Sequence, residues 1–437
     1  MTDVLEPTAG RAATWRKTTF AALEDPQYRR LWVGGLISFL AVQMEFISRG
    51  WLAFRLTGSN AGLGAVYLGF GVPMLLLTPW GGVAADRLPK RTVLMGCQFT
   101  LAMSSFTVAV AEIGGFLTYP LLIGTAVLQG AGFSFLGPAR MAFTGELVGR
   151  ERLGNAVVLQ QMSMNGTRVF GPSVAGLLIG VPAFGVGGVY LMTTTLMLTT
   201  LWNTSRLPHG RPPEDREVRS PLHEMGDGVR YVRDRRPILI LVLTSLVVVM
   251  FAFPYVAFLP TLADRVFDVG SSGYGLMSGA SAIGALAASL LIAGRAGGPS
   301  ATRIQLLCGL AFGAGVASLG HAPTFVVGLV MVMVIGAASS GFQSLNNSLV
   351  LDRTDLAYHG RVQSLMMLSF SGFGMMALPL GALADDIGIT TTMGIMGSVA
   401  MAAVVVSMLL RRGEAPPERN ELGGDAGPRR PAPSVLP

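Results

Sequence analysis

The sequence predicts an all-α polytopic membrane protein, with twelve transmembrane helices arranged as two pseudo-symmetric six-helix bundles. Of its 437 residues, 51% are apolar and only 13% are charged, whereas roughly 25% of the residues of an ordinary soluble domain are charged. Glycine occurs 57 times, and membrane helices accept glycine more readily than soluble helices do. The high apolar content also excludes a disordered chain.

The apolar stretches are each long enough for one membrane helix. A spanning helix needs about 20 mostly apolar residues, because every backbone polar group must be bonded within its own segment. Twelve such stretches occur, at residues 31–54, 62–84, 92–114, 119–141, 156–179, 184–202, 238–263, 273–294, 302–320, 323–345, 362–384 and 390–410. A polar segment precedes the first stretch, so we expect the first helix itself to act as the insertion signal.

The basic residues give the expected orientation. With the N-terminus placed in the cytoplasm, 28 of the 32 lysines and arginines fall in cytoplasmic segments or, for Arg140 and Arg303, at the cytoplasmic ends of the stretches, and only Arg55 and Arg265 fall outside. This excess follows the positive-inside rule. We therefore expect a multi-pass protein of the cell (inner) membrane with both termini in the cytoplasm, whose net charge of +7 faces lipid headgroups rather than nucleic acid.

A long polar interruption divides the chain into two halves. The expected parts are a cytoplasmic tail (1–30), the first bundle (31–202), a cytoplasmic linker (203–237), the second bundle (238–410) and a Pro-rich, disordered tail (411–437). In the linker, Leu222, Met225, Val229 and Val232 recur at helical spacing, which predicts a short amphipathic helix on the membrane surface. Paired halves are usual in secondary transporters, with the binding site between them.

The loop between the second and third stretches carries a charged turn. It reads Gly82-Val83-Ala84-Ala85-Asp86-Arg87-Leu88-Pro89-Lys90-Arg91. Glycine permits close helix approach, and a carboxylate here can bond to a cation or to the N-terminus of a neighbouring helix. The run resembles the G-x-x-x-D-R-x-G-R-R/K signature of the major facilitator superfamily, with Pro89 in place of the second glycine and Lys90 in place of the first arginine.

Other segments extend the resemblance over about residues 20 to 410. They include Tyr28-Arg29-Arg30-Leu31-Trp32, Gly137-Pro138-Ala139-Arg140, Gly226–Pro237 and Gly360-Arg361-Val362. Together they resemble the branch that contains the enterobactin exporter and macrolide-type efflux proteins. The resemblance implies a cytoplasmic gate with Asp86 as its carboxylate and Arg140 as its candidate partner. The remaining expected gate residues are Gly82, Arg87, Lys90 and Arg91.

Three ionisable residues, Glu45, Arg49 and Arg168, are expected at membrane depth. Such residues are costly in a bilayer and are functional candidates by default. Glu45 and Arg49 are four residues apart, hence on one helical face and able to pair, and Arg49 is near enough to the surface to snorkel outward. The first and fifth helices are neighbours in the superfamily fold, which implies a contact between Glu45 and Arg168.

These three residues are the candidates for proton coupling. Burial favours the neutral form of a carboxyl, whereas a nearby arginine favours the charged form, so protonation of Glu45 can respond to the opening of a cavity. Arg168 does not deprotonate in a protein and would tune Glu45 or hold an anionic substrate. The alternative interpretation is a structural cluster that locks the first and fifth helices together.

The segment around Arg168 resembles the G-P-x-x-x-G antiporter motif, which is associated with export in the superfamily. Its residues are Gly166, Gly171, Pro172 and Gly176. Small residues permit close packing, and proline permits a bend. The substrate cavity is expected to contain adaptable Met and aromatic side chains and a few amides, namely Met44, Phe46, Gln160, Met164, Phe251, Tyr255, Gln343, Asn346, Met366 and Phe370.

The sequence therefore predicts a secondary active transporter. The favoured function is proton-coupled export (antiport) of a lipophilic or amphipathic small molecule, such as a drug or siderophore, by alternating access. The alternative is a proton-coupled importer or uniporter of a small hydrophilic solute. The chain lacks a P-loop, a credible nucleophile–base pair and metal-ligand spacing, so we expect no enzyme activity, metal or cofactor. The expected partners are the substrate, protons and the bilayer, without nucleic acid, and the chain is expected to be a monomer.

Overall fold

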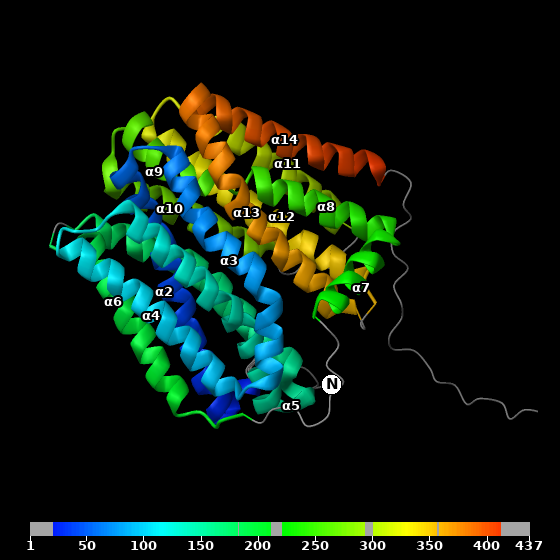
Figure 1. Ribbon diagram of the computed structural model, residues 1–437. Helices are drawn as coiled ribbons and strands as arrows, with labels where there is room; N and C mark the ends of the chain where they lie inside the picture. The colour runs from blue at the N-terminus through cyan, green and yellow to red at the C-terminus, as the bar shows by residue number, and fades with distance from the viewer. Residues whose placement is uncertain (1–20, 182, 211–220, 293–299, 356–357, 412–437) are drawn as a thin grey trace, which may run out of the picture.

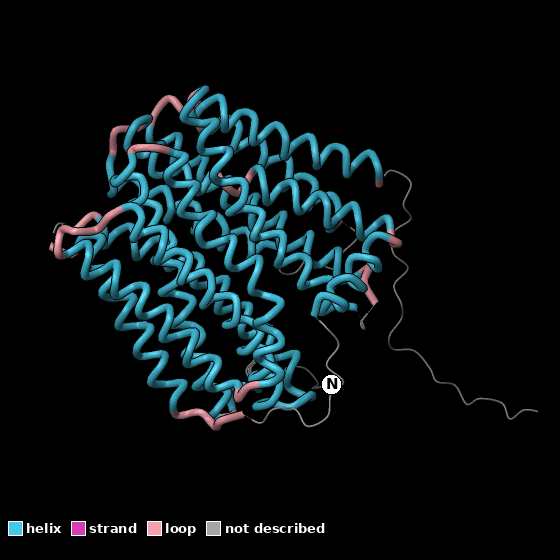
Figure 2. Tube along the Cα trace, in the orientation of Figure 1, coloured by secondary structure: helices cyan, strands magenta, loops and turns pink. Residues whose placement is uncertain are grey.

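The computed structural model describes residues 21–181, 183–210, 221–292, 300–355 and 358–411, which fold into helices joined by short loops (Figures 1 and 2). The first half contains η1 (Ala21–Glu24), α2 (Pro26–Thr57), α3 (Asn60–Arg87), α4 (Lys90–Ile113), α5 (Tyr119–Ile179) and α6 (Gly185–Ser205). The helix α7 (Pro221–Arg233) precedes the second half. That half contains α8 (Arg236–Phe251), α9 (Tyr255–Thr261), the π-helical η2 (Leu262–Val266), α10 (Gly270–Ile292), α11 (Ala301–Leu319), α12 (Phe325–Asp352), α13 (His359–Ile387) and α14 (Ile389–Leu410).

Local sequence explains where the helices begin, break and end. The Asp25 side chain accepts hydrogen bonds from the first turn of α2, which caps that helix. The same helix ends at Gly58, whose φ of 59° is left-handed. Gly149, with φ of 69°, divides α5 into two helices, so α5 holds two predicted spans. Pro254, which lacks a backbone donor, stands between α8 and α9.

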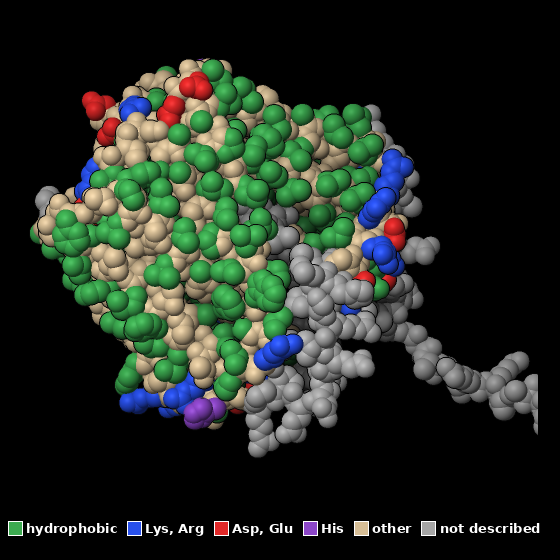
Figure 3. Space-filling model, viewed as in Figure 1, with side chains coloured by type: hydrophobic (Ala, Val, Ile, Leu, Met, Phe, Trp, Pro, Cys, Tyr) green, Lys and Arg blue, Asp and Glu red, His purple; other side chains and the backbone are tan. Residues whose placement is uncertain are grey.

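Nine segments of the described chain are long and apolar enough to cross a membrane. They match nine of the twelve predicted spans. The other three, at residues 156–179, 184–202 and 362–384, are helical as the second part of α5, as α6 and as α13. On the face shown in Figure 3, charged side chains gather at two ends, and the band between them is rich in hydrophobic side chains. The predicted all-helical, multi-span class is confirmed.

The two halves contact each other closely at one end of the molecule. There α3 packs on α13, and α5 packs on α10. A Cβ atom on Gly176 would lie 2.2 Å from the Cα atom of Gly275, so these backbones touch directly. We call this end, with residues 58–59, 114–118 and 267–269, the loop end, and the opposite end, which carries α7, the linker end. Figure 1 shows the helices of the two halves diverging from the loop end toward α7.

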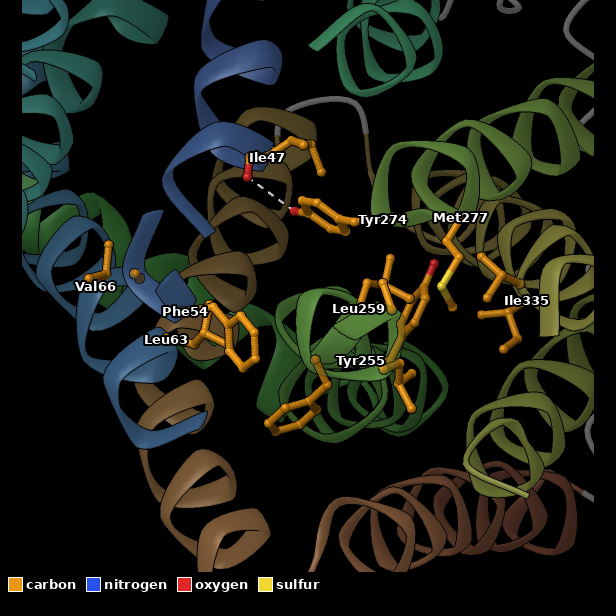
Figure 4. Packing of buried hydrophobic residues seen from close by; sticks show 14 of the residues in the cluster. Ile47, Phe54, Leu63, Val66, Tyr255, Leu259, Tyr274, Met277 and Ile335 are labelled. Atoms are coloured by element: carbon orange, nitrogen blue, oxygen red, sulfur yellow. Dashed lines mark hydrogen bonds between the residues drawn. The ribbon is translucent and has the colours of Figure 1, made fainter. Parts of the chain in front are cut away.

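The largest hydrophobic cluster joins the two halves near the loop end. Ile47, Phe54 and Leu63 come from the first half, and Tyr274 and Met277 come from the second (Figure 4). The Tyr274 hydroxyl also donates a hydrogen bond of 3.1 Å to the backbone carbonyl of Ile47. Closure at this end is therefore stabilised by burial of apolar surface as well as by polar contacts.

The helix α7 forms as predicted, but its contact face is different. Val229, expected on the apolar face, is 50% exposed, whereas Tyr231 and Val232 are buried. Tyr231 stacks on Tyr358 with ring centroids 4.0 Å apart, and its hydroxyl accepts a hydrogen bond of 2.8 Å from the Asp355 backbone. The helix therefore packs on the second half instead of lying only on a lipid surface. Of the predicted tails at 1–30 and 411–437, residues 1–20 and 412–437 lie outside the described residues, whereas residues 21–30 form η1 and the beginning of α2.

Candidate functional site: a buried carboxyl and the contacts between the halves

Glu45 lies in α2 with its side chain completely buried. The Ser105 hydroxyl on α4 donates a hydrogen bond to its Oε1 atom, and the Gln129 amide on α5 donates one to its Oε2 atom. Among the described residues, no cation lies within 4.0 Å of this carboxylate. Because its hydrogen-bond donors are neutral, the carboxyl can gain or lose a proton without breaking an ion pair.

Arg49 shares a helical face with Glu45, but the two do not form the expected ion pair. Its guanidinium is 3% exposed, so the expectation that it snorkels outward is wrong. The side chain is enclosed within the first half, where Nη1 lies 3.5 Å from the Thr125 hydroxyl on α5. Its Nε and Nη2 atoms are buried without a hydrogen-bond partner, so Arg49 adds positive potential to the carboxyl site.

Arg168 is not brought to Glu45 as the superfamily resemblance implied. Its side chain is exposed on α5, whereas Thr167 and Gly171 beside it are buried. Gly171 faces α2, because a Cβ atom there would lie 2.5 Å from the Cβ atom of Gln43. Arg168 is three residues from Gly171, hence only about 60° from it around the helix. What argues against the expected contact is therefore the set of partners of the Glu45 carboxyl, which are Ser105 and Gln129.

The charged turn after α3 is only partly described. Asp86 belongs to α3, but its side chain lies outside the described residues, and Arg87 is exposed. Lys90 is buried, with its Nζ atom 3.4 Å from the Glu146 carboxylate on α5. Arg91 donates a hydrogen bond of 3.1 Å to the backbone carbonyl of Leu207. Glu146 is thus a charged member of this region that the motif did not indicate.

One expectation for this region is corrected by the helix packing, and another stays a prediction. The close approach expected at Gly82 occurs one residue earlier, where a Cβ atom on Gly81 would lie 2.5 Å from the Ser134 carbonyl oxygen. The described contacts of Arg140 are with α2, whereas the side chain of its expected partner Asp86 lies outside the described residues. The Nη2 atom of Arg140 lies 3.3 Å from the Ser38 hydroxyl, and its guanidinium covers the ring of Phe39.

The antiporter-like motif acts at two helix crossings. Gly171 allows α5 to approach α2, and Gly176 allows α5 to touch α10 of the other half. Pro172 lies inside the helix between them, and Gly166 faces open space. Gly171 and Gly176 are therefore required for close helix packing, and Gly176 lies at the contact between the halves.

The expected cavity residues divide into three groups. Met44, Tyr255, Asn346 and Met366 are buried in the hydrophobic cores or in polar contacts, so these four side chains face no open cavity in this conformation of the described chain. Phe46 instead joins Tyr67 and Phe373 in an aromatic cluster between the halves. The rest lie in intermediate positions or outside the described side chains: Met164, Phe251 and Gln343 are half-buried, Gln160 lines a small pocket, and Phe370 is not described.

At the loop end, Asp385 on α13 caps the N-terminus of α3, a contact that the sequence analysis missed. Its carboxylate accepts hydrogen bonds from the Ser59 hydroxyl at 2.6 Å and from the backbone of Asn60 and Ala61 at 2.9 Å each. The first amides of a helix lack partners within that helix and favour an anion. We call these four residues the loop-end latch, because they tie one half of the protein to the other.

The pKa of Asp385 makes the latch sensitive to pH. Partial burial raises this pKa, but the hydrogen bonds from Ser59, Ala61 and Asn60 outweigh it and lower the pKa below its ordinary value. The closed state therefore binds a proton less readily than a state in which the latch is open. The latch therefore stabilises closure fully above the ordinary pKa of an aspartate, about 3.9. This stabilisation is lost as the pH falls through the lowered pKa of Asp385.

Asp385→Ala is expected to weaken closure at the loop end. Loss of a helix cap costs about 1 kcal/mol, which is roughly a fivefold change in the balance between closed and open states. Spin labels at Phe116→Cys and His321→Cys would report the distance between the halves. The variant should show a larger open fraction at neutral pH, and the difference from wild type should shrink below about pH 4. Equal distance distributions at neutral pH would contradict this role.

Comparison with known proteins agrees with this architecture. A family model described as transmembrane secretion effector matches residues 17–422. The staphyloferrin A transporter of Staphylococcus aureus is 26% identical over 80% of this chain and 88% of its own length. The enterobactin exporter EntS of Shigella flexneri is 25% identical over 78% of this chain and 80% of its own length.

Solved transporters share the fold. The nucleoside transporter NupG aligns with 89% of this chain and 100% of its own, with a TM-score of 0.68 and 15% identity. A D-xylose-proton symporter aligns with 87% of this chain and 96% of its own, with a TM-score of 0.67 and 14% identity. The chain therefore belongs to the transmembrane secretion effector family of the major facilitator superfamily, and it is a multi-pass membrane transporter of small molecules rather than an enzyme.

Proposed function

We propose that this transporter is a proton-coupled exporter of an amphipathic small molecule, a drug-like compound or a siderophore, which works by alternating access. Glu45 is its proton site. The observation that carries the proposal is the state of that carboxyl, which is completely buried and held by the neutral donors Ser105 and Gln129. A buried carboxyl of this kind is costly to retain in a membrane helix without a function.

Two further observations support export. The relatives named above include an enterobactin exporter and a staphyloferrin A transporter. Between the halves, the rings of Phe46, Tyr67 and Phe373 form a cluster with centroids 4.7 to 5.9 Å apart. Aromatic surfaces of this kind suit an amphipathic molecule better than a sugar, which requires several polar groups.

The orientation follows from the basic residues. The linker end carries most lysines and arginines, so we place it in the cytoplasm with both termini. Contact between the halves at the loop end then makes this the cytoplasm-open state. In that state Asp385 and the rest of the loop-end latch close the outer side, and they must separate before substrate can leave.

Transport into everted membrane vesicles tests the proposed function. The vesicle interior is acidified, and uptake of fluorescein and rhodamine 123 is followed alongside labelled glucose and alanine. The expected result is accumulation of at least one dye that stops when the pH gradient is collapsed. Uptake of only glucose or alanine, or dye uptake that ignores the gradient, would contradict proton-coupled export and favour the importer or uniporter.

A further inference from the structure

A small pocket lies in the first half at the linker end, between α2 and both parts of α5. Its lining includes the aromatic side chains of Tyr28, Trp32 and Phe39 and the polar side chains of Arg140 and Gln160. The free volume is about 10 Å³, which is room for about one water molecule or one small polar group. The pocket therefore fits the end group of a ligand rather than a whole molecule.

The polar groups that line this pocket differ in whether they have hydrogen-bond partners. The Tyr28 hydroxyl and the Trp32 ring N–H donate hydrogen bonds of 2.8 and 3.0 Å to backbone carbonyls of α5. Arg140, in contrast, is 3% exposed, and its Nε and Nη1 atoms are buried without a hydrogen-bond partner. The pocket thus contains buried donors that this conformation of the protein leaves unused.

The charge of Arg140 also lacks a counter-charge in the part of the chain that the structure describes. Among the described residues, no carboxylate lies within 4.0 Å of its guanidinium. Arginine stays protonated in proteins, and a buried charge without a counter-charge is strongly unfavourable. The contact with the ring of Phe39, 4.7 Å from the guanidinium carbon, offsets only part of this cost. An anion in the pocket would supply the missing charge.

We propose that Arg140 binds the carboxylate of an amphipathic anionic substrate, whose aromatic or apolar body lies against Trp32 and Phe39. This inference rests on the proposed export function and names its substrate class, which is small organic anions rather than lipophilic cations. A charge-assisted hydrogen bond from arginine to carboxylate is among the strong interactions available to a protein. The volume of the pocket admits about one oxygen of that carboxylate beside Arg140.

The matched probes dansyl-glycine and dansyl-glycinamide test this assignment, because they differ only in a carboxylate and an amide. Their dansyl fluorescence is titrated with the detergent-purified full-length protein. Wild type is expected to bind dansyl-glycine about ten- to a hundredfold more tightly, the range for a hydrogen bond to a charged group. Arg140→Gln should remove that preference and Arg140→Lys should keep part of it. Arg206→Gln, at an exposed arginine of the linker end, should leave it unchanged.

A second variant, Gly35→Ala, keeps the positive charge of Arg140 but changes the position of its guanidinium. A Cβ atom on Gly35 would lie 3.3 Å from the Arg140 Nη1 atom, so Gly35→Ala should displace the guanidinium and reduce the preference several-fold. Gly96→Ala on α4, where a Cβ atom meets open space, is the control. Thermal unfolding of each variant without ligand shows whether it is folded. If Arg140→Gln does not fold, Gly35→Ala decides the question.

The other outcomes separate this inference from the export function. Equal binding of both probes by wild type, or a carboxylate preference that survives in folded Arg140→Gln, would overturn the inference and leave export intact. A different result would be that phosphatidylglycerol raises the thermal stability of wild type but not of Arg140→Gln, while dansyl-glycine has no effect. That result would assign the site to a lipid headgroup and would also overturn the inference. Failure of every dye in the vesicle assay would refute export, while the binding preference would still be measurable.

Discussion

Glu45→Gln is expected to abolish substrate accumulation driven by a pH gradient while leaving the protein folded. Glutamine has nearly the size of glutamate, and its amide oxygen can still accept the hydrogen bond from Gln129. It cannot bind or release a proton, so the coupling step is lost. We expect gradient-driven dye uptake in everted vesicles to fall more than about tenfold, as for loss of a functional ionisable group in a membrane.

Ser105→Ala is the matched control for this prediction. It removes one hydrogen bond to Glu45 but keeps the titratable carboxyl, so uptake should persist with an altered dependence on pH. Gradient-driven uptake by Glu45→Gln at the wild-type rate would instead assign the carboxyl to the structural cluster considered in the sequence analysis.

Gly64→Ala is expected to force the halves apart at the loop end. A Cβ atom there would lie 2.3 Å from the Ala377 carbonyl oxygen and 2.5 Å from the Leu378 Cα atom. Both are backbone atoms, so no side-chain rotation can relieve the overlap. Overpacking of this kind costs about 1–3 kcal/mol, which changes the ratio of closed to open states about five- to 150-fold. Labels at Phe116→Cys and His321→Cys should report a longer distance.

Gly124→Ala is the control for this second prediction. Gly124 lies in α5 of the same half, and a Cβ atom there meets open space, so the label distance should stay at the wild-type value. A short distance in Gly64→Ala, matching that control, would show that the α3–α13 contact does not hold the loop end closed.

The sequence predicted the helices well because their signals are local. Each of the twelve predicted apolar stretches coincides with a described helix or with consecutive described helices. The exact helix boundaries and the contact face of α7 differed from the prediction. Gly149 was not identified as the residue at which α5 divides into two helices, and the contact face of α7 shifted to Tyr231 because that ring stacks on Tyr358 in the second half.

The site was predicted less completely because its contacts join distant segments. Glu45 was identified, since a charge in an apolar stretch is visible in the sequence. Its donors Ser105 and Gln129 resemble ordinary polar residues of membrane helices and become identifiable only when α4 and α5 are packed beside α2. The latch formed by Asp385 pairs residues more than 300 positions apart, and nothing in either segment alone indicates the other.

The most direct test of the account is a count of protons exchanged on substrate binding. The purified protein is mixed, in weak buffer with a pH indicator, with the dye that the vesicle assay identifies. Wild type should release protons as the dye binds, because proton and substrate alternate in an antiporter, and Glu45→Gln should bind the dye without proton release. Equal release by both proteins would contradict Glu45 as the coupling site, and no release by either would contradict proton antiport itself.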